Sequence, residues 1–391
     1  MFVTQAPTTP PAAEATPTVR RTDLDLLRIV VCFSVILAHA LLIFGAEPNY
    51  HVKSAMPWPV ASVVYEFMRI ATLAIFFVLA GWSAVGSLRR RSWTRYLKDR
   101  VQRIFVPLVA GMLLLGPVIK WIELGQGRDL RLGGFRLVPP PEIDFVAFLA
   151  RYYTRGDTLT WSHLWFLAYL LVISLALLPL LLVLAKRVPE GRVPGRAMAY
   201  APALILVGYI VATEAYWPFL PRLVGDWANL GYFSLCFAGG AVLACWPGME
   251  ERLKAEGVWL AGLSFVGLAL VVLAGEGIVG RIGVGLCAWG AIGGGLGLAA
   301  RWRPAPSPLM TWMGEATMPV YVLHHIPVLA LGVLMLPWGW APWWTVLVIT
   351  VVATVISLLA YRWLVQPWSW VRVAMGMDAQ PRAAARTQPP R

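Results

Sequence analysis

The sequence predicts an all-α fold, a polytopic membrane bundle of about ten transmembrane helices. Hydrophobic side chains make up 59% of the 391 residues, charged side chains only 14%, and the mean hydropathy is +0.67. Soluble domains are typically about half apolar and about a quarter charged, so this composition excludes an ordinary soluble protein. A bilayer core about 30 Å thick requires roughly 20 apolar residues per helix. Runs of about this length recur along nearly the whole chain.

The apolar runs give the order of the expected helices. They fall at about 24–45, 60–82, 104–121, 162–184, 199–216, 229–246, 258–274, 281–300, 311–336 and 343–364. We expect one integral-membrane domain over residues 20–375, flanked by disordered cytoplasmic tails at 1–19 and 376–391. The N-terminal tail lacks the basic segment and apolar core of a signal peptide.

The distribution of charge predicts that both termini face the cytoplasm. The formal charge is +13, from 33 Lys and Arg against 20 Asp and Glu. The basic residues cluster between apolar runs, above all in the segment Arg89–Arg103, and loops rich in Lys and Arg stay on the cytoplasmic side. An even number of spans then gives an N-in, C-in topology. Because topology accounts for the basic excess, we expect the lipid bilayer and no nucleic acid as a partner.

The sequence carries no signature of a resident metal or cofactor. The cysteines lie in or at the ends of apolar runs without paired spacing, so we expect neither disulfides nor a metal site. Walker A loops, G-x-S-x-G elbows, zincin helices and dinucleotide fingerprints are absent from the sequence.

His39 is the strongest candidate for a catalytic residue. It follows Arg28 by eleven residues in the run DLDLLRIVVCFSVILAHALLIF. That spacing is a helical rise of roughly 16 Å, which places His39 near mid-membrane if Arg28 marks the cytoplasmic edge. A neutral imidazole at that depth is suited to take a proton from a hydroxyl. A structural histidine that bonds a neighbouring helix is the alternative, and the residues alone leave it open.

Three arginines are candidates for binding an anionic substrate from the cytosol. Arg28 lies at the predicted cytoplasmic mouth below His39, and Arg100 and Arg103 form an R-x-x-R pair on one helical face just before the third run. Paired guanidinium groups bind phosphate through bidentate hydrogen bonds. The alternative is that these arginines bind no ligand and only keep their loops on the cytoplasmic side of the membrane.

Other ionisable or aromatic residues of the apolar runs are candidates for the wall of an acceptor pocket. They are Glu66, Arg69, His163, Trp165, Glu315, His324 and His325. Glu66 and Arg69 share a helical face, and an ion pair that merely satisfies itself is an equally good reading. Pro319 and Pro327 flank the two adjacent histidines and predict a kinked or interrupted helix, which lines cavities more often than lipid.

Five segments follow one another along the chain: DLDLLRIVVCFSVILAHA, FFVLAGWSAVGSLRRR, YLKDRVQRIFVPLVAGMLLLGP, HLWFLAYLL and MPVYVLHH. In this order they resemble the integral-membrane acyltransferase family 3, especially its glucan biosynthesis protein C branch. The resemblance covers about residues 20 to 375. It implies a ten-helix bundle in the bacterial inner membrane. It also implies that His39 matches the family's essential histidine, Arg28 its partner, and Arg100 and Arg103 its R-x-x-R pair.

The resemblance further implies an enzyme that transfers an acetyl or succinyl group. Acyl-CoA would be a co-substrate rather than a permanently bound cofactor, and the acceptor a hydroxyl of a glucan, another saccharide or a lipid-linked molecule. Two other classes stay open: a transporter or flippase that uses His39, Glu66 and Arg69, and a scaffold subunit without a site of its own. The oligomeric state is also open, since the sequence contains no coiled-coil heptads.

Overall fold

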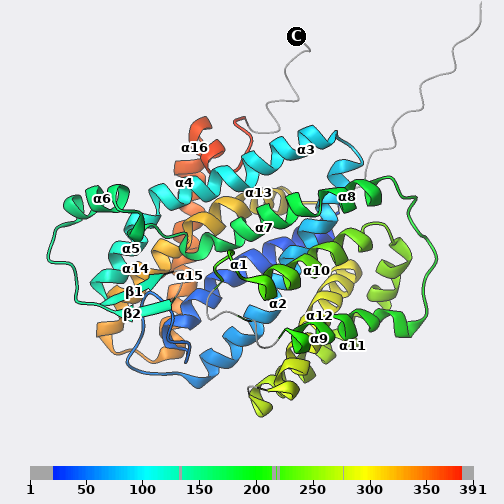
Figure 1. Ribbon diagram of the computed structural model, residues 1–391, viewed down its shortest axis with the longest axis horizontal. Helices are drawn as coiled ribbons and strands as arrows, with labels where there is room; N and C mark the ends of the chain where they lie inside the picture. Colours follow the sequence, from blue (N-terminus) through cyan, green and yellow to red (C-terminus); the bar gives the residue numbers. More distant parts are fainter. Residues whose placement is uncertain (1–20, 132–133, 214–216, 218–220, 276, 381–391) are drawn as a thin grey trace, which may run out of the picture.

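The described part of the chain is a helical bundle that carries one small β-hairpin (Figure 1). This computed structural model describes residues 21–131, 134–213, 217, 221–275 and 277–380. The predicted N-terminal tail, 1–19, lies outside these residues. Within them the all-α membrane fold is confirmed.

Each of the predicted apolar runs is mainly helical over its described residues. Five helices are long and apolar enough to cross a membrane: α1 (Thr22–Phe44), α2 (Pro59–Leu88), α11 (Pro247–Ala274), α12 (Ile278–Trp302) and α15 (Pro342–Ala360), which a π-helical turn extends to Val365. Two shorter helices are α9 (Ala201–Ala212) and α10 (Trp227–Leu243).

Three further runs form helix pairs bent at a break. They are α3 (Trp93–Arg100) and α4 (Val106–Leu114) with α5 (Gly116–Gly125), bent by 44°; α7 (Trp165–Ala176) with α8 (Leu178–Ala185), by 60°; and α13 (Pro308–Leu323) with α14 (His325–Met335), by 56°. By length the described residues give five spans, or up to eight if each bent pair is one span. The count of ten and the N-in, C-in orientation therefore stay predictions.

The interruption predicted between Pro319 and Pro327 is confirmed, and it falls at His324, where α13 ends and α14 begins. A proline lacks the amide hydrogen that would continue the helical ladder, so the helix breaks most readily between two such residues. The bend brings His324 and His325 into the interior of the bundle, where both are buried.

The remaining elements lie at the ends of the bundle. The strands β1 (Arg128–Arg131) and β2 (Gly134–Leu137) form an antiparallel hairpin, followed by α6 (Phe145–Thr154). Figure 1 places the hairpin and α6 at one side and α3 and α16 (Ser369–Ala374) along the top.

The predicted C-terminal tail begins at residue 376, but part of it is held in place. Gln102 donates to the carbonyl oxygen of Met377, and Arg103 bonds the Asp378 carboxylate. Residues 381–391 lie outside the described part.

Helices α2 and α10 approach so closely that only glycine fits at their crossing. A Cβ on Gly240 would lie 1.9 Å from the carbonyl oxygen of Val78, and one on Gly81 would lie 1.9 Å from that of Phe237. Small residues that let backbones touch are the usual basis of helix packing in membranes.

We expect Gly240→Ala to separate these helices and to lower the free energy of unfolding by about 1–3 kcal/mol, the usual cost of overpacking. The matched control is Gly239→Ala, because a Cβ there meets nothing within 4 Å. Thermal unfolding in detergent compares the two variants, and equal midpoints would contradict the close approach.

Candidate functional site

All five histidines of the chain meet in one cluster, although they come from four separate segments. They are His39 near the C-terminal end of α1, His51 in the loop between α1 and α2, His163 in the turn before α7, and His324 and His325 at the bend between α13 and α14. His39 is partly buried and the other four are buried. α1 ends at Phe44, so His39 lies nearer the end of its helix than the middle.

The rings are in direct contact. The ring centroids of His39 and His325 are 4.4 Å apart, those of His163 and His325 are 4.6 Å apart, and those of His39 and His324 are 5.3 Å apart. The structure thus brings His163, His324 and His325 around His39, as expected of a shared cavity wall. Both adjacent histidines face His39. Their part in binding an acceptor stays a prediction.

Several ring nitrogens in this cluster lack a protein partner. His163 donates from Nε2 to the carbonyl oxygens of Tyr321 and Val322, each at 3.1 Å, and His324 donates from Nδ1 to that of Tyr321 at 2.7 Å. Nδ1 of His39, Nδ1 of His163, Nε2 of His324 and both nitrogens of His325 are buried without a partner in the described residues. Because buried polar atoms are normally satisfied, unpartnered nitrogens around one space indicate a place for a polar ligand.

The same donor set has the composition of a metal site. Ring nitrogens of His39, His324 and His325 lie within 4.8 Å of one another, and neutral imidazole is a common ligand of transition metals. The sequence-based expectation of no metal stays a prediction.

A buried polar network adjoins the cluster, and the sequence analysis missed it. His51 bonds Glu123 through Nδ1, and its Nε2 lies 3.1 Å from the Ser162 hydroxyl. Lys120 bridges Glu123 at 2.5 Å and Asp129 of the hairpin at 2.6 Å. A loop histidine after the first apolar run and a Lys–Glu pair near the end of the third run were the signals available in the sequence. No motif or spacing in the sequence links this histidine to the Lys–Glu pair.

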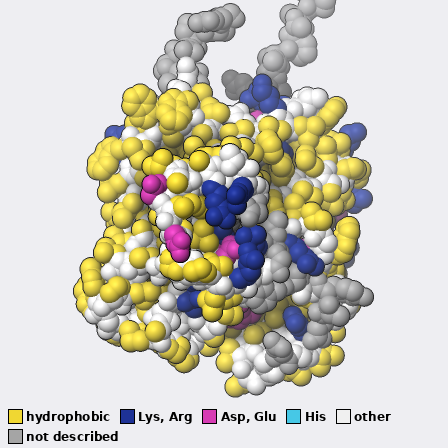
Figure 2. All heavy atoms as spheres, turned by 60° about the vertical axis from the view of Figure 1, so that its left-hand side comes forward, with side chains coloured by type: hydrophobic (Ala, Val, Ile, Leu, Met, Phe, Trp, Pro, Cys, Tyr) yellow, Lys and Arg dark blue, Asp and Glu magenta, His cyan; other side chains and the backbone are white. Residues whose placement is uncertain are grey.

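The hairpin and α6 form a basic pocket beside this network. The pocket has a volume of about 250 Å³, and its charged lining residues include Lys120, Asp129, Arg131, Arg136 and Arg151. Figure 2 turns this side of the molecule forward and shows Lys and Arg side chains gathered within a largely hydrophobic surface. An anionic or hydroxyl-rich molecule would find hydrogen-bond donors here.

The three arginines predicted to bind the donor lie outside the histidine cluster, and Arg28 is near the N-terminal end of α1. Arg28 donates to Asp25 and to the Ser83 hydroxyl, each at 3.1 Å. Arg100 stacks over the Tyr96 ring at 4.9 Å, and its buried Nε has no hydrogen-bond partner in the described residues. Arg103 pairs with Asp378 at 3.1 Å. A π-helical turn, Val101–Phe105, joins α3 to α4; it begins directly after Arg100 and contains Arg103, and such turns are frequent at functional sites.

Two of the proposed acceptor-pocket residues form a pair of their own. Arg69 donates to both carboxylate oxygens of Glu66, at 2.9 and 2.5 Å, and is 46% exposed. Its electrostatic neighbours include Tyr65 and Tyr232 rather than a histidine. This arrangement agrees with the alternative interpretation, an ion pair in which Glu66 and Arg69 neutralise each other and bind no acceptor. Trp165 packs its ring against Tyr169, 5.4 Å between centroids.

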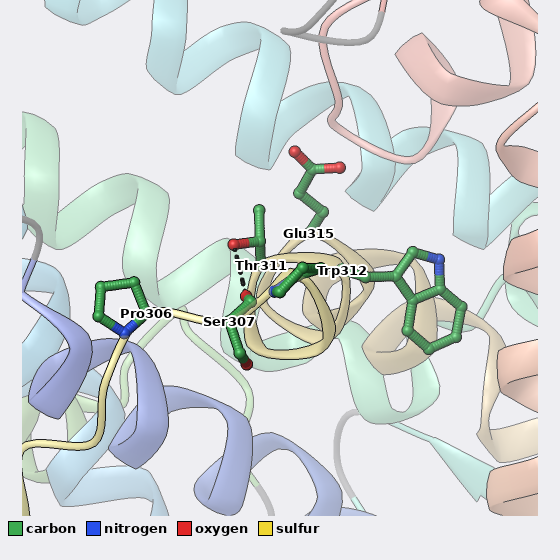
Figure 3. Close-up of a pocket in the computed structure, with 6 residues that line it drawn as sticks. Pro306, Ser307, Thr311, Trp312 and Glu315 are labelled. Atoms are coloured by element: carbon green, nitrogen blue, oxygen red, sulfur yellow. Dashed lines mark hydrogen bonds between the residues drawn. The ribbon is translucent and has the colours of Figure 1, made fainter.

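Glu315 lies in a different place, an open pocket of about 440 Å³ at the start of α13. Figure 3 shows its carboxylate extending away from the neighbouring Trp312, while Thr311 donates to the Ser307 carbonyl oxygen at 3.0 Å. Glu315 lies in the middle of α13, nine residues before His324, so a helical rise of roughly 13 Å separates it from the cluster.

Lys53 fixes the end of the helix that carries His39. Its Nζ donates to the carbonyl oxygens of Leu42 at 2.6 Å and Gly45 at 2.5 Å. Burial, reinforced by the charge of Arg128, lowers the pKa of Lys53 to about 8 from 10.5, although Glu47 opposes the shift.

This depressed pKa gives a pH dependence of stability. Between about pH 8 and pH 10.5 the unfolded chain binds more protons at this lysine than the folded protein, so its contribution to stability rises with pH. We expect the thermal midpoint of the wild type, minus that of Lys53→Met, to increase from pH 8 to pH 10.5. A difference that stays constant over this range would contradict the shifted pKa.

Comparisons with known proteins identify the family of the chain. A family model described as an acyltransferase domain, of the acyltransferase 3 type, matches residues 21–362. Proteins named "Glucans biosynthesis protein C" from Escherichia coli strains SE11 and 55989 / EAEC are each 26% identical over 162 residues. The match covers 40% of this chain and 38% of each relative's length. No solved structure matches. Because the family model spans most of the chain and includes every clustered histidine, the protein belongs to the acyltransferase 3 family of membrane proteins.

Proposed function

We propose that this protein is a membrane O-acyltransferase that uses cytosolic acyl-CoA and acylates a hydroxyl at or beyond the outer face of a bacterial inner membrane. The acyl group is acetyl or succinyl, and the acceptor is a glucan, another saccharide or a lipid-linked molecule. The observation that carries the proposal is that the rings of His163, His324 and His325 all contact that of His39 in a chain of this family. The printed name of the relatives supports a glucan acceptor.

The positions of these residues support separate donor-binding and catalytic sites. Arg100 and Arg103, with Arg28, hold the phosphates of coenzyme A, and the pantetheine arm reaches along the helix toward His39. The rise from Arg28 to His39 is roughly 16 Å, within reach of an arm about 15 to 20 Å long. His39 then takes the proton of the acceptor hydroxyl as the hydroxyl attacks the thioester, or accepts the acyl group itself before passing it on.

The test is thiol release from acetyl-CoA and succinyl-CoA by the purified protein in lipid, with a periplasmic glucan extract as acceptor. We expect free thiol and acylated glucan in equal amounts with one of the two donors. A transporter or flippase would instead accumulate solute in vesicles without releasing thiol, and that result would overturn the proposal.

Removal of either donor-binding arginine should act on the Michaelis constant. We expect Arg100→Ala and Arg103→Ala each to raise the KM for acyl-CoA by about 10- to 100-fold, because a charge-assisted hydrogen bond contributes about 1.5–3 kcal/mol. Their kcat should change less.

The matched control is Arg95→Ala on the same helix, because Arg95 is 59% exposed and pairs only loosely with Asp99 at 3.4 Å. Acyl-pantetheine, which lacks the phosphates, should be used equally well by the wild type and both variants. If the variants lose activity equally with both donors, Arg100 and Arg103 do not bind phosphate.

A further inference from the structure

Ser162, His51 and Glu123 are connected in the order of a catalytic triad. The Ser162 hydroxyl oxygen lies 3.1 Å from Nε2 of His51, and the other ring nitrogen of His51 bonds the Glu123 carboxylate. Hydroxyl, imidazole and carboxylate linked through the two ring nitrogens are the arrangement that activates serine nucleophiles, and it arises on unrelated folds in different chain orders.

The surroundings of Glu123 favour an ionised carboxylate. Glu123 is fully buried, and its second oxygen accepts hydrogen bonds from Lys120 Nζ at 2.5 Å and from the Leu130 amide at 2.7 Å. An ionised carboxylate can only accept a hydrogen bond, so Nδ1 of His51 must donate to it. In that tautomer Nε2 carries the lone pair and faces the Ser162 hydroxyl as a base.

Ser162 also has the backbone conformation of a strained position. Its φ is +43°, in the left-handed region that non-glycine residues seldom adopt, and its amide donates to the Thr160 hydroxyl at 3.0 Å. Strain of this kind concentrates at functional sites, where the surrounding structure enforces it. Ser162 is partly exposed whereas His51 and Glu123 are buried, so the hydroxyl is the accessible member of the three.

The triad is continuous with the histidine cluster. The ring of His51 lies 5.1 Å from that of His325, which in turn lies 4.4 Å from that of His39. A hydroxyl activated by His51 therefore adjoins the cluster that contains the base assigned to the acceptor.

We propose that Ser162 carries the acyl group as an ester between acyl-CoA and the acceptor. This inference rests on the proposed function. In the first step the Ser162 oxygen attacks the thioester carbonyl carbon while its proton moves to Nε2 of His51. The carbon–sulfur bond breaks, and the departing thiolate takes the proton from His51 and leaves as coenzyme A thiol.

In the second step the acceptor hydroxyl attacks the ester carbonyl while its proton moves to His39. The bond between the acyl carbon and the Ser162 oxygen breaks. That oxygen, which is partly exposed, takes a proton from water, and His39 gives its proton back to water, so the step has no net gain or loss of protons. Both steps exchange one acyl bond for another, so neither requires an oxidant, a reductant or a further co-reactant.

The test is single-turnover labelling with acyl-CoA that carries a radioactive acyl group, without acceptor, followed by acid quench and peptide mapping. For the wild type we expect label on the peptide that contains Ser162, stable to neutral hydroxylamine and released by alkaline hydroxylamine, as for an oxygen ester. Ser162→Ala should lose this label and slow transfer to the glucan extract by about 10³-fold or more. Ser162→Cys should instead give a thioester that neutral hydroxylamine releases.

The control is Ser357→Ala, since the Ser357 hydroxyl only bonds the Ala353 carbonyl oxygen of its own helix, at 2.7 Å. Transfer by Ser162→Ala at the wild-type rate, or label that maps to His39 in both proteins, would overturn the serine carrier and leave the acyltransferase intact. If the wild type releases no thiol from either donor, the proposed function fails and this inference fails with it. Unchanged thermal midpoints of both Ser162 variants exclude misfolding as the cause of a loss.

Discussion

Alanine in place of His39 is expected to lower the rate of acyl transfer by about 10²- to 10⁴-fold, the range that a positioned general base contributes. The ring of His39 contacts those of His163, His324 and His325, and its Nδ1 is buried without a protein partner in the described residues. Its removal leaves the acceptor hydroxyl without a base at the point where the predicted donor path ends. Steady-state thiol release, measured with the donor that the wild type uses, gives the size of the loss.

A matched control for His39 lies on the same helix. Cys32 is buried in α1, and its Sγ lies 3.2 Å from the Thr317 carbonyl oxygen, so Cys32→Ala disturbs the packing of α1 without touching the histidine cluster. We expect it to retain most of the activity. If His39→Ala and Cys32→Ala release thiol at the same rate, His39 has no chemical role, and a scaffold function would become the better account of the chain.

The helical architecture could be predicted because its signals are local. An apolar run of sufficient length specifies a helix in a bilayer whatever its neighbours are, and a pair of prolines around His324 specifies an interruption. The same locality explains why Glu66 and Arg69 were found as an ion pair, since residues three apart share a helical face. The number of complete spans was harder to predict, because a break within a run divides one span into two short helices.

The site could be predicted only where one residue carried its own signal. His39, His163, His324 and His325 each stood out as ionisable groups in an apolar run, but their mutual contact depends on how three separate segments pack. Ser162, His51 and Glu123 left no such signal, because a loop histidine and a serine before a helix are ordinary in sequence. Their connection is tertiary, and no spacing along the chain encodes it.

Lys120 is expected to be the residue outside the histidine cluster whose loss most reduces stability. It is 2% exposed, and it lies between the carboxylates of Glu123 and Asp129, which are almost completely buried. Lys120→Met removes the cation and leaves two buried carboxylates close together. Breaking a buried ion pair in this way costs about 3–5 kcal/mol, because the remaining charge has lost both water and its partner.

The control for Lys120→Met is a lysine in an equivalent local pattern at the surface. Lys254 pairs with Glu251 at 3.7 Å across the same spacing, but these two side chains are 44% and 62% exposed. We expect Lys254→Met to cost less than about 1 kcal/mol, as surface pairs do. Chemical denaturation in detergent compares the two. Similar losses in both variants would contradict the burial of the Lys120 network.

A double variant separates the charge effect from the loss of the lysine's packing. In Lys120→Met with Asp129→Asn one buried negative charge is gone, so we expect part of the lost stability to return. Arg131 and Arg136 lose the Asp129 carboxylate as a partner, but both lie at the surface, where water replaces it. Because Lys120 also holds Glu123, the single variant should weaken the bond that orients His51. Its thiol release should therefore fall even at temperatures where the protein stays folded. Full activity there would show that Glu123 needs no cation to position His51.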